Sequence, residues 1–148
     1  NEVMEKHGVL ETVKKRDLNM RDVVNMAAMV EMEAVFAEEQ PRIAGVFLKR
    51  VEIGMPIQSD TTIQYILGAQ KETITFKDTE IDNPYNTYQN FGLPPGPIGS
   101  PSLSAIQAVL EPEQTDYLYF VAQNDGHHRF SRTYAEHLRA IDEIYYGR

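Results

Sequence analysis

The sequence predicts an α+β fold, a mainly helical single domain with one small antiparallel β-hairpin and an ordered loop rich in proline and glycine. Apolar residues recur at helical spacing in the first third of the chain. Later, the apolar run Tyr117–Ala122 is followed by Asn-Asp-Gly at 124–126, which is a hairpin signal. Strand and helix signals do not alternate, which disfavours a parallel βαβ sheet.

The expected helices are bounded by capping residues and by glycine or proline. Asn19 precedes an apolar stripe that predicts a helix from Met20 to about Phe36. A polar, partly amphipathic helix is expected before it, over residues 2–16. Further helices are expected over residues 42–52, 61–67, 103–110 and 133–145, with Asp60, Ser102 and Thr133 as caps and Gly54 and Gly68 as stops.

The segments between these helices differ in character. Residues 69–82 are polar and weakly patterned, with one short strand expected near Thr73–Phe76. Residues 83–101 hold five of the eight prolines together with several aromatic rings, a composition too irregular for a helix and too aromatic for a linker. We expect this segment to be an ordered, functional loop. The hairpin strands are expected at Tyr117–Ala122 and His128–Ser131.

Composition excludes several classes of function. A chain of 148 residues suits one domain. Its 14 Lys and Arg against 22 Asp and Glu give a net charge of −8, which argues against a nucleic-acid partner. The absence of cysteine excludes disulfides, thiolate metal sites and cysteine nucleophiles. No signal peptide or membrane span is recognisable, and because the chain starts at Asn1 we expect a processed or excised piece of a longer protein.

Two glutamates border the apolar stripe of the helix expected from Met20. At about 100° per residue, Glu33 lies roughly 60° from Val30 on one side, and Glu31 lies on the other. Apolar surroundings favour the protonated form of a carboxyl group, which a general acid for glycosidic cleavage requires near neutral pH. Spacing alone does not choose between the two glutamates, and it fits two ordinary boundary residues equally well.

A second group of residues combines amides, hydroxyls and aromatic rings. Flat rings stack on the faces of sugars, and amides bind hydroxyl and N-acetyl groups. The structural alternative makes Asp60 a helix cap, and Tyr85 and Tyr88 packing residues of the proline-rich loop. The candidate sugar-binding residues are Gln58, Ser59, Asp60, Tyr65, Asn86, Thr87 and Tyr88.

Two further patterns have weaker functional interpretations. Leu93–Ile98 reads either as a polyproline ligand for a partner domain or as a rigid wall of a groove, and the missing basic anchor favours the wall. Asp125, His127 and His128 have turn spacing and no fourth ligand, which disfavours a metal site. His128, with Ser131 on the same strand, could instead face a cleft. There is no glycine-rich phosphate loop and no nucleophile elbow.

Several ordered blocks of this sequence resemble the endolytic murein transglycosylases, the YceG-like family of bacterial cell-wall enzymes. Taken singly, such strings are moderate indicators, but their number and order make chance agreement implausible. The similarity covers roughly Asn19 to Tyr146. The blocks are AAMVEMEA (27–34), IAGVFLKR (43–50), GMPIQSDTTIQY (54–65), NPYNTY (83–88), GLPPGPI (92–98) and DYLYFVA (116–122), followed by the hairpin and the TYAEH helix start.

The resemblance implies an active site distantly like that of lysozyme, with Glu33 as the catalytic residue and Glu31 as a supporting neighbour. It implies cleavage of the β-1,4 bond between N-acetylmuramic acid and N-acetylglucosamine, with 1,6-anhydro ends and without metal or cofactor. The residues that it places around the glycan cleft are Gln58, Ser59, Asp60, Tyr65, Tyr85, Asn86, Thr87, Tyr88, His128 and Ser131.

The resemblance also implies a cellular setting. We expect residues 1–148 to be the catalytic domain alone, without the membrane-spanning segment and LysM-like subdomain typical of the family. The expected location is the extracytoplasmic face of the cytoplasmic membrane, with peptidoglycan strands as substrate and cell-wall synthesis machinery as a partner. Two other functions stay open, a non-catalytic peptidoglycan-binding module and an interaction domain that docks through the proline-rich loop.

Overall fold

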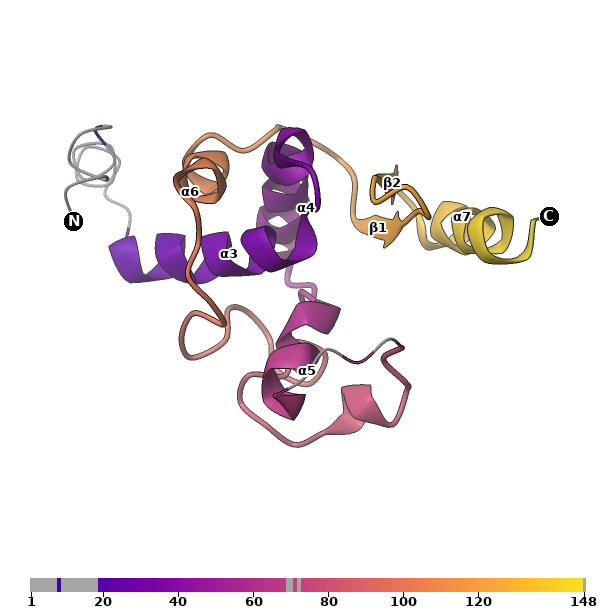
Figure 1. The fold of residues 1–148 in the computed structure, drawn as a ribbon, viewed down its shortest axis with the longest axis horizontal. Coiled ribbons are helices and arrows are strands. Elements are labelled where there is room, and N and C mark those ends of the chain that lie inside the picture. The colour runs from indigo at the N-terminus through magenta and orange to yellow at the C-terminus, as the bar shows by residue number, and fades with distance from the viewer. Residues whose placement is uncertain (1–7, 9–18, 69–70, 72, 148) are drawn as a thin grey trace.

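Three helices form the core of the protein. The computed structural model describes residues 8, 19–68, 71 and 73–147. Helices α3 (Met20–Glu33), α4 (Gln40–Ile53) and α6 (Leu103–Leu110) pack against one another, with α4 crossing the carboxyl end of α3 (Figure 1). Their shared interior is built mainly from Ala, Val, Ile and Met side chains together with Phe47, most of them with almost no exposed surface. This core fixes the end of α3, where Glu33 lies.

Local sequence explains where these helices begin. The Asn19 side chain accepts hydrogen bonds from two backbone N–H groups in the first turn of α3. Pro41 lies in the first turn of α4, where its missing N–H costs nothing. Ser102 caps α6 by accepting a hydrogen bond from the backbone N–H of Ala105. Gly54 follows α4 in the left-handed conformation that favours glycine.

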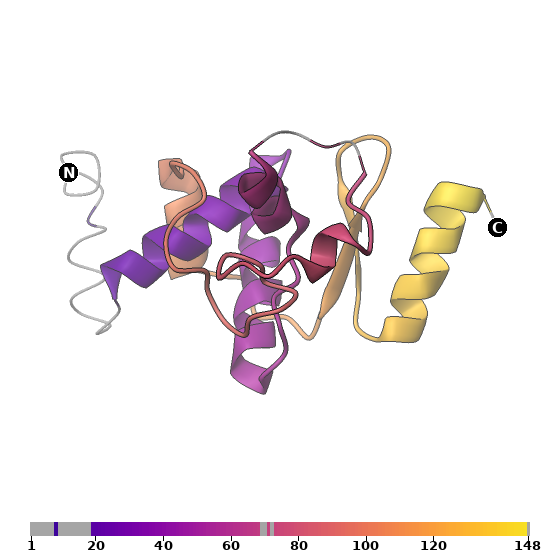
Figure 2. The same ribbon diagram turned by 90° about the horizontal axis from the view of Figure 1, so that it is seen from below.

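The β-hairpin connects the core to the last helix. Strands β1 (Tyr119–Ala122) and β2 (His128–Ser131) pair antiparallel, with Phe120 opposite Phe130 and Ala122 opposite His128. Because side chains alternate along a strand, one face of the hairpin carries Phe120 and meets Phe47 of the core. The opposite face packs on α7 (Tyr134–Tyr146), so the hairpin lies between the core and α7 (Figure 2).

A third region covers the carboxyl end of α3 from the other side. It contains α5 (Asp60–Leu67), the 3₁₀ turn η2 (Asp78–Glu80) and the proline-rich loop of residues 83–101. The side chain of Asn86 has no exposed surface, and its amide donates to the backbone carbonyls of Thr79 and Ile81. Buried bonds of this kind hold an irregular loop in one conformation. The predicted ordered loop is therefore confirmed.

The predicted α+β class is confirmed, and most element boundaries lie within three residues of the prediction. The helix from Met20 ends at Glu33, three residues early, because Ala34 is extended. The predicted strand at Thr73–Phe76 is wrong, since these residues form a bend and a turn before η2. Ser59, rather than Asp60, is the N-cap of α5. The first strand starts at Tyr119.

The helix predicted over residues 2–16 falls, apart from residue 8, outside the residues that the structure describes. Within the described part of the chain, no helix combines the length and the apolar character that crossing a bilayer requires.

Candidate active site

Glu33 lies where three parts of the fold meet. As the last residue of α3, it projects toward the hairpin and toward the start of α5. Its Oε1 atom is 3.4 Å from Nε2 of His128, and its Oε2 atom accepts a hydrogen bond of 3.4 Å from Oγ of Ser59. The side chain is 17% exposed, so it is mostly enclosed but keeps some contact with solvent. The surroundings are more polar than the apolar border expected from helical spacing.

His128 is enclosed between two carboxylates. Its side chain is 2% exposed, and Nδ1 lies 2.9 Å from Oε1 of Glu39, in the 3₁₀ turn η1 (Ala37–Glu39). The backbone N–H of His128 also donates to Glu39, at 3.0 Å to each carboxylate oxygen. Burial lowers the pKa of His128, but Glu33 and Glu39 outweigh it and raise that pKa above the ordinary value. His128 therefore keeps its cationic form to a higher pH than an isolated histidine does.

Hydroxyl groups hold Ser59 in place beside Glu33. Thr61 shares a hydrogen bond of 2.6 Å between its Oγ1 and Ser59 Oγ. Thr87 accepts the backbone N–H of Ser59 at 2.9 Å and is itself 3.0 Å from the hydroxyl of Thr62. Ser59, Thr62 and Thr87 are all buried. The network joins α5 to the proline-rich loop and fixes the Ser59 hydroxyl toward Glu33.

Asp60 and Tyr88 form a second polar pair next to Glu33. The Tyr88 hydroxyl donates to Oδ1 of Asp60. Although Asp60 keeps contact with solvent, burial among protein atoms raises its pKa; the Tyr88 bond opposes this and the nearby charge of Glu33 adds to it. Burial and the Asp60 charge raise the pKa of Tyr88 in turn. Glu33 thus lies between the Asp60–Tyr88 pair and His128, which Glu39 contacts from its other side, an arrangement suited to proton transfer.

Arg50 fixes the segment that leads into the site. It is buried in α4, where its Nε donates to the carbonyl of Leu118 at 2.7 Å. Its Nη1 donates to the carbonyls of Pro56 and Ile57, both at 3.0 Å, and to Oε1 of Gln58 at 3.3 Å. Gln58 has a φ of +54°, a left-handed conformation that is uncommon outside glycine and that concentrates at functional sites.

The aromatic candidates lie on α5 and the proline-rich loop. Tyr65 is 45% exposed, and its ring meets that of Tyr85 with centroids 4.9 Å apart. This leaves the Tyr65 ring open to a flat ligand, whereas Tyr85 is half-buried against the core. Asn86 and Thr87 are both buried. The Asn86 amide bonds the carbonyls of Thr79 and Ile81, and the Thr87 hydroxyl bonds the start of α5, so both side chains position the loop rather than face a cleft.

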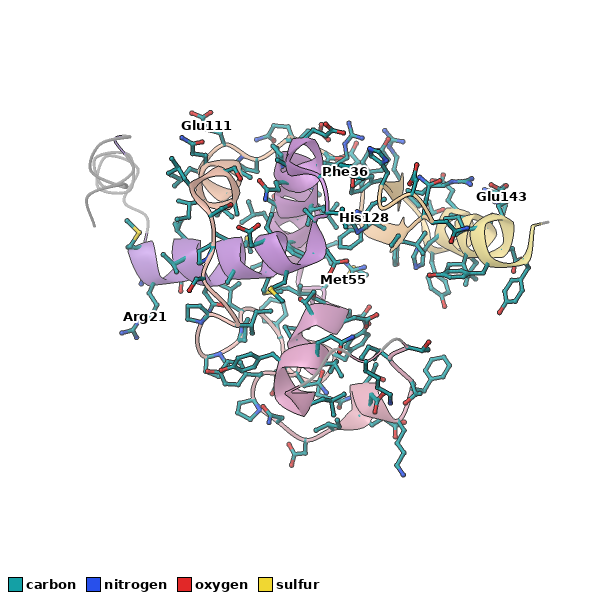
Figure 3. The ribbon with its side chains drawn as sticks, in the orientation of Figure 1. Arg21, Phe36, Met55, Glu111, His128 and Glu143 are labelled. Carbon is teal, nitrogen blue, oxygen red and sulfur yellow. The ribbon has the colours of Figure 1, made fainter. Side chains whose placement is uncertain are left out.

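The structure separates two predicted residues from this cluster. Ser131 is three residues from His128 on β2 and therefore points to the opposite face of the hairpin, where it lines a small pocket with Glu143 of α7. Figure 3 places His128 on the core side of the hairpin and Glu143 on α7 beyond it. Glu31 accepts the backbone N–H of Ser102 at 2.6 Å, a structural contact at the start of α6. Glu33, rather than Glu31, belongs to the polar cluster.

Two features elsewhere do not coincide with the cluster. A cavity of about 590 Å³ on another face of α4 is lined by Arg42, Gly45 and Lys49 among others, and by none of the predicted site residues. His127, next to His128, turns outward and stacks on Phe36 with ring centroids 4.0 Å apart. Among the described residues, no three His, Asp or Glu side chains are arranged to hold a metal ion.

The sequence is similar to those of known proteins. The YceG-like family matches residues 1–143 of the chain. The chain belongs to the YceG-like family. A relative from Bacillus subtilis (strain 168), named endolytic murein transglycosylase, is 42% identical over 131 residues, which are 88% of this chain and 36% of the relative. One of the same name from Streptococcus pneumoniae serotype 2 is 38% identical over 138 residues, covering 89% of this chain and 25% of the relative.

A solved structure supports the same placement. The crystal structure of a YceG-like protein from Listeria monocytogenes superposes with a TM-score of 0.86 at 39% identity, covering 93% of this chain and 44% of that one. The resemblance stated from the sequence motifs is therefore confirmed. The chain spans less than half the length of each of these YceG-like relatives.

Sequence reasoning missed two residues of this YceG-like site, Glu39 and Arg50. Glu39 was visible only as part of an acidic pair, Glu38–Glu39, and its partner lies 89 residues away. The sequence offers one indication of this contact, the adjacent histidines His127 and His128. In the structure His127 contacts Glu38 and His128 contacts Glu39. Arg50 was visible only as a residue near the end of a helix.

Proposed function

We propose that this chain is the catalytic part of a lytic transglycosylase that cleaves peptidoglycan glycan strands. The observation that carries the proposal is the convergence of Ser59 and His128 on the two oxygens of Glu33, a partly exposed carboxyl group at the end of a helix. The names of two YceG-like relatives support the same activity. The bond cut is the β-1,4 link between N-acetylmuramic acid and N-acetylglucosamine, within the strand rather than at its end.

Glu33 serves first as acid and then as base. Protonated Glu33 donates to the oxygen that leaves with N-acetylglucosamine, while positive charge develops on the muramic acid ring. The ionised Glu33 then takes the proton of the C6 hydroxyl of the same muramic residue, whose oxygen closes on C1. The product is a 1,6-anhydro end. Because the nucleophile belongs to the substrate, its high effective concentration replaces a positioned water, and no second carboxylate nucleophile is needed.

Neighbouring residues supply the glycan contacts in this proposal. The exposed ring of Tyr65 stacks on a sugar, and exposed Gln58 binds hydroxyl or N-acetyl groups. Asp60, held by Tyr88, accepts hydrogen bonds from sugar hydroxyls beside the bond that breaks. Tyr85 supports Tyr65 from behind.

The substrate determines where the enzyme must act. Peptidoglycan lies outside the cytoplasmic membrane, so we place the catalytic part on the extracytoplasmic face, within a longer membrane-anchored protein. Cell-wall synthesis enzymes, which supply new strands, are the partners that this location favours. A peptidoglycan-binding module without catalysis is the second candidate, and binding without strand shortening would favour it.

The test is Glu33→Gln. Replacing the carboxyl by an amide of the same shape removes the transferable proton, so we expect cleavage to fall at least about 100-fold with glycan binding retained. Purified sacculi are digested, and the soluble products are measured by mass spectrometry. Glu31→Gln on the same helix is the matched control and should keep activity, since Glu31 bonds Ser102 instead.

Two outcomes would contradict the proposal. Equal digestion by the wild-type chain and Glu33→Gln would remove Glu33 from the chemistry. Products with reducing ends, heavier by one water than anhydro ends, would identify a hydrolase in place of a transglycosylase.

A further inference from the structure

The contacts of Glu39 determine which nitrogen of His128 carries a proton. Glu39 accepts the backbone N–H of His128, so this side chain acts as a hydrogen-bond acceptor. At 2.9 Å from Oε1 of Glu39, the ring Nδ1 must then be the donor. The opposite ring atom, Nε2, faces Oε1 of Glu33 at 3.4 Å. Nε2 is therefore the ring nitrogen that can gain or lose a proton without breaking the Glu39 contact.

The rest of the pocket keeps the imidazole in this orientation. The Phe120 ring meets the His128 ring edge-on, with centroids 5.2 Å apart, and Phe130 lies on the same strand with centroids 6.2 Å away. Only 2% of the histidine side chain is exposed, so water cannot readily substitute for either carboxylate. A ring flip would replace the Glu39 contact with one to carbon, which burial makes unfavourable.

We propose that Glu39 is a positioning residue that fixes the proton on His128 Nδ1 and thereby makes Nε2 the proton store for Glu33. The inference rests on the proposed function, since it describes how the same glutamate is supplied with its proton. It assigns to His128 a role in proton transfer rather than in direct glycan binding. It assigns to Glu39 a role through His128 alone.

The proton steps balance. In the resting pair His128 is cationic and Glu33 is ionised; the Nε2–H bond breaks and an O–H bond forms on Glu33. Glu33 then passes this proton to the leaving glycosidic oxygen. After the C6 hydroxyl gives its proton to Glu33, that proton returns to Nε2, and the resting pair is restored. The distance of 3.4 Å is long for a hydrogen bond, as catalytic contacts often are before substrate binds.

The charges around His128 support a cationic resting state. From α3 it faces Glu33 and from η1 it faces Glu39, and these two carboxylates raise its pKa against the opposing effect of burial. Beyond Glu33 lie Asp60 and Tyr88. His127, the residue before β2, turns outward to Glu38 and Asp125. The neighbouring residue on β2, Arg129, lies on the opposite face of the hairpin, where it pairs with Glu143.

Glu39→Gln tests the proposal, with Glu38→Gln as the matched control. Glutamine can still accept the backbone N–H of His128, so the fold should hold, which thermal unfolding checks. Without the negative charge, His128 loses its proton at lower pH. We expect kcat on glycan strands to fall about tenfold or more with little change in KM, and the alkaline limb of the pH–rate profile to move to lower pH. Glu38→Gln should leave both unchanged.

Histidine titration by ¹⁵N NMR gives a readout independent of activity. Wild-type His128 should be cationic at neutral pH and carry its proton on Nδ1 when it deprotonates. Glu39→Gln should shift the titration of His128 but not of His127, and Glu38→Gln should do the reverse, because Glu38 raises the pKa of His127.

The outcomes separate the two proposals. A Glu39→Gln chain with the wild-type pH profile, or a neutral His128 protonated on Nε2, overturns the proton store while cleavage itself stands. A wild-type chain that cuts no glycan strands overturns the proposed function, and the proton store with it.

Discussion

Replacing Arg50 with methionine should destabilise the protein far more than the same change at Arg42 on the same helix. Arg50 is 7% exposed and its guanidinium donates to three backbone carbonyls, at 2.7–3.0 Å. Methionine has a similar length but donates nothing. The bond to Ile57 is buried and those to Leu118 and Pro56 are partly buried. At about 1 kcal/mol for each carbonyl left without its donor, the lower end of the measured range, the three together give about 3 kcal/mol.

Two other effects adjust this magnitude. Burial lowers the pKa of Arg50, which means that the cation itself is held at a cost that methionine does not incur. For this reason we use the lower end of the range. A loss of about 3 kcal/mol corresponds to a fall in Tm of roughly 6–12 °C for a domain of this size.

The control is Arg42→Met. Arg42 pairs with Glu113 at 2.7 Å, but these side chains are 44% and 37% exposed, and exposed pairs contribute at most about 1 kcal/mol. Thermal and urea unfolding followed by circular dichroism measure both variants. Equal losses in the two variants, or a loss at Arg50 below about 1 kcal/mol, would refute the assignment of Arg50 as the anchor of residues 56–58.

Two further predictions concern stability. Gly45→Ala should destabilise the protein, because the added Cβ would lie 2.4 Å from the backbone oxygen of Glu113. The steric cost of about 2–3 kcal/mol outweighs the roughly 1 kcal/mol that alanine gains in helix propensity. An unchanged Tm would contradict this prediction. The Lys71 ammonium lowers the pKa of Asp78 to about 2. The stability that ionised Asp78 contributes is therefore present above its unfolded pKa and is lost as the pH falls toward 2. We expect the urea denaturation midpoints of Asp78→Asn and wild type to differ at pH 7 and to converge near pH 2.

The helical framework could be predicted because its signals are local. Asn19, Ser102 and Thr133 cap the helices that they precede, and each bond spans only two or three residues. Such bonds follow from residue type and position alone. The predicted strand at Thr73–Phe76 was wrong because a short β-prone run needs a partner strand, and the backbone here turns into η2 instead.

The candidate site could be predicted only in part. Three of the predicted site residues, Glu33, Ser59 and His128, lie in contact in the structure. The side of the hairpin on which Ser131 lies follows from strand alternation, yet the sequence does not say which face meets the core. The burial of Asn86 depends on carbonyls five and seven residues away in an irregular loop, which no periodic pattern encodes.

The early end of α3 links these observations. Since Ala34 is extended, Phe36 leaves the helix direction and packs under the hairpin tip, where a Cβ on Gly126 would lie 3.1 Å from its ring. His127 stacks on the same ring, which holds the chain in place immediately before His128 and the start of β2. After Phe36 the chain turns through η1, and this turn places Glu39 on the other side of His128 from Glu33. A helix continued to Phe36 would carry Glu39 along its axis and away from His128, so the break after Glu33 is what makes the two-carboxylate pocket possible.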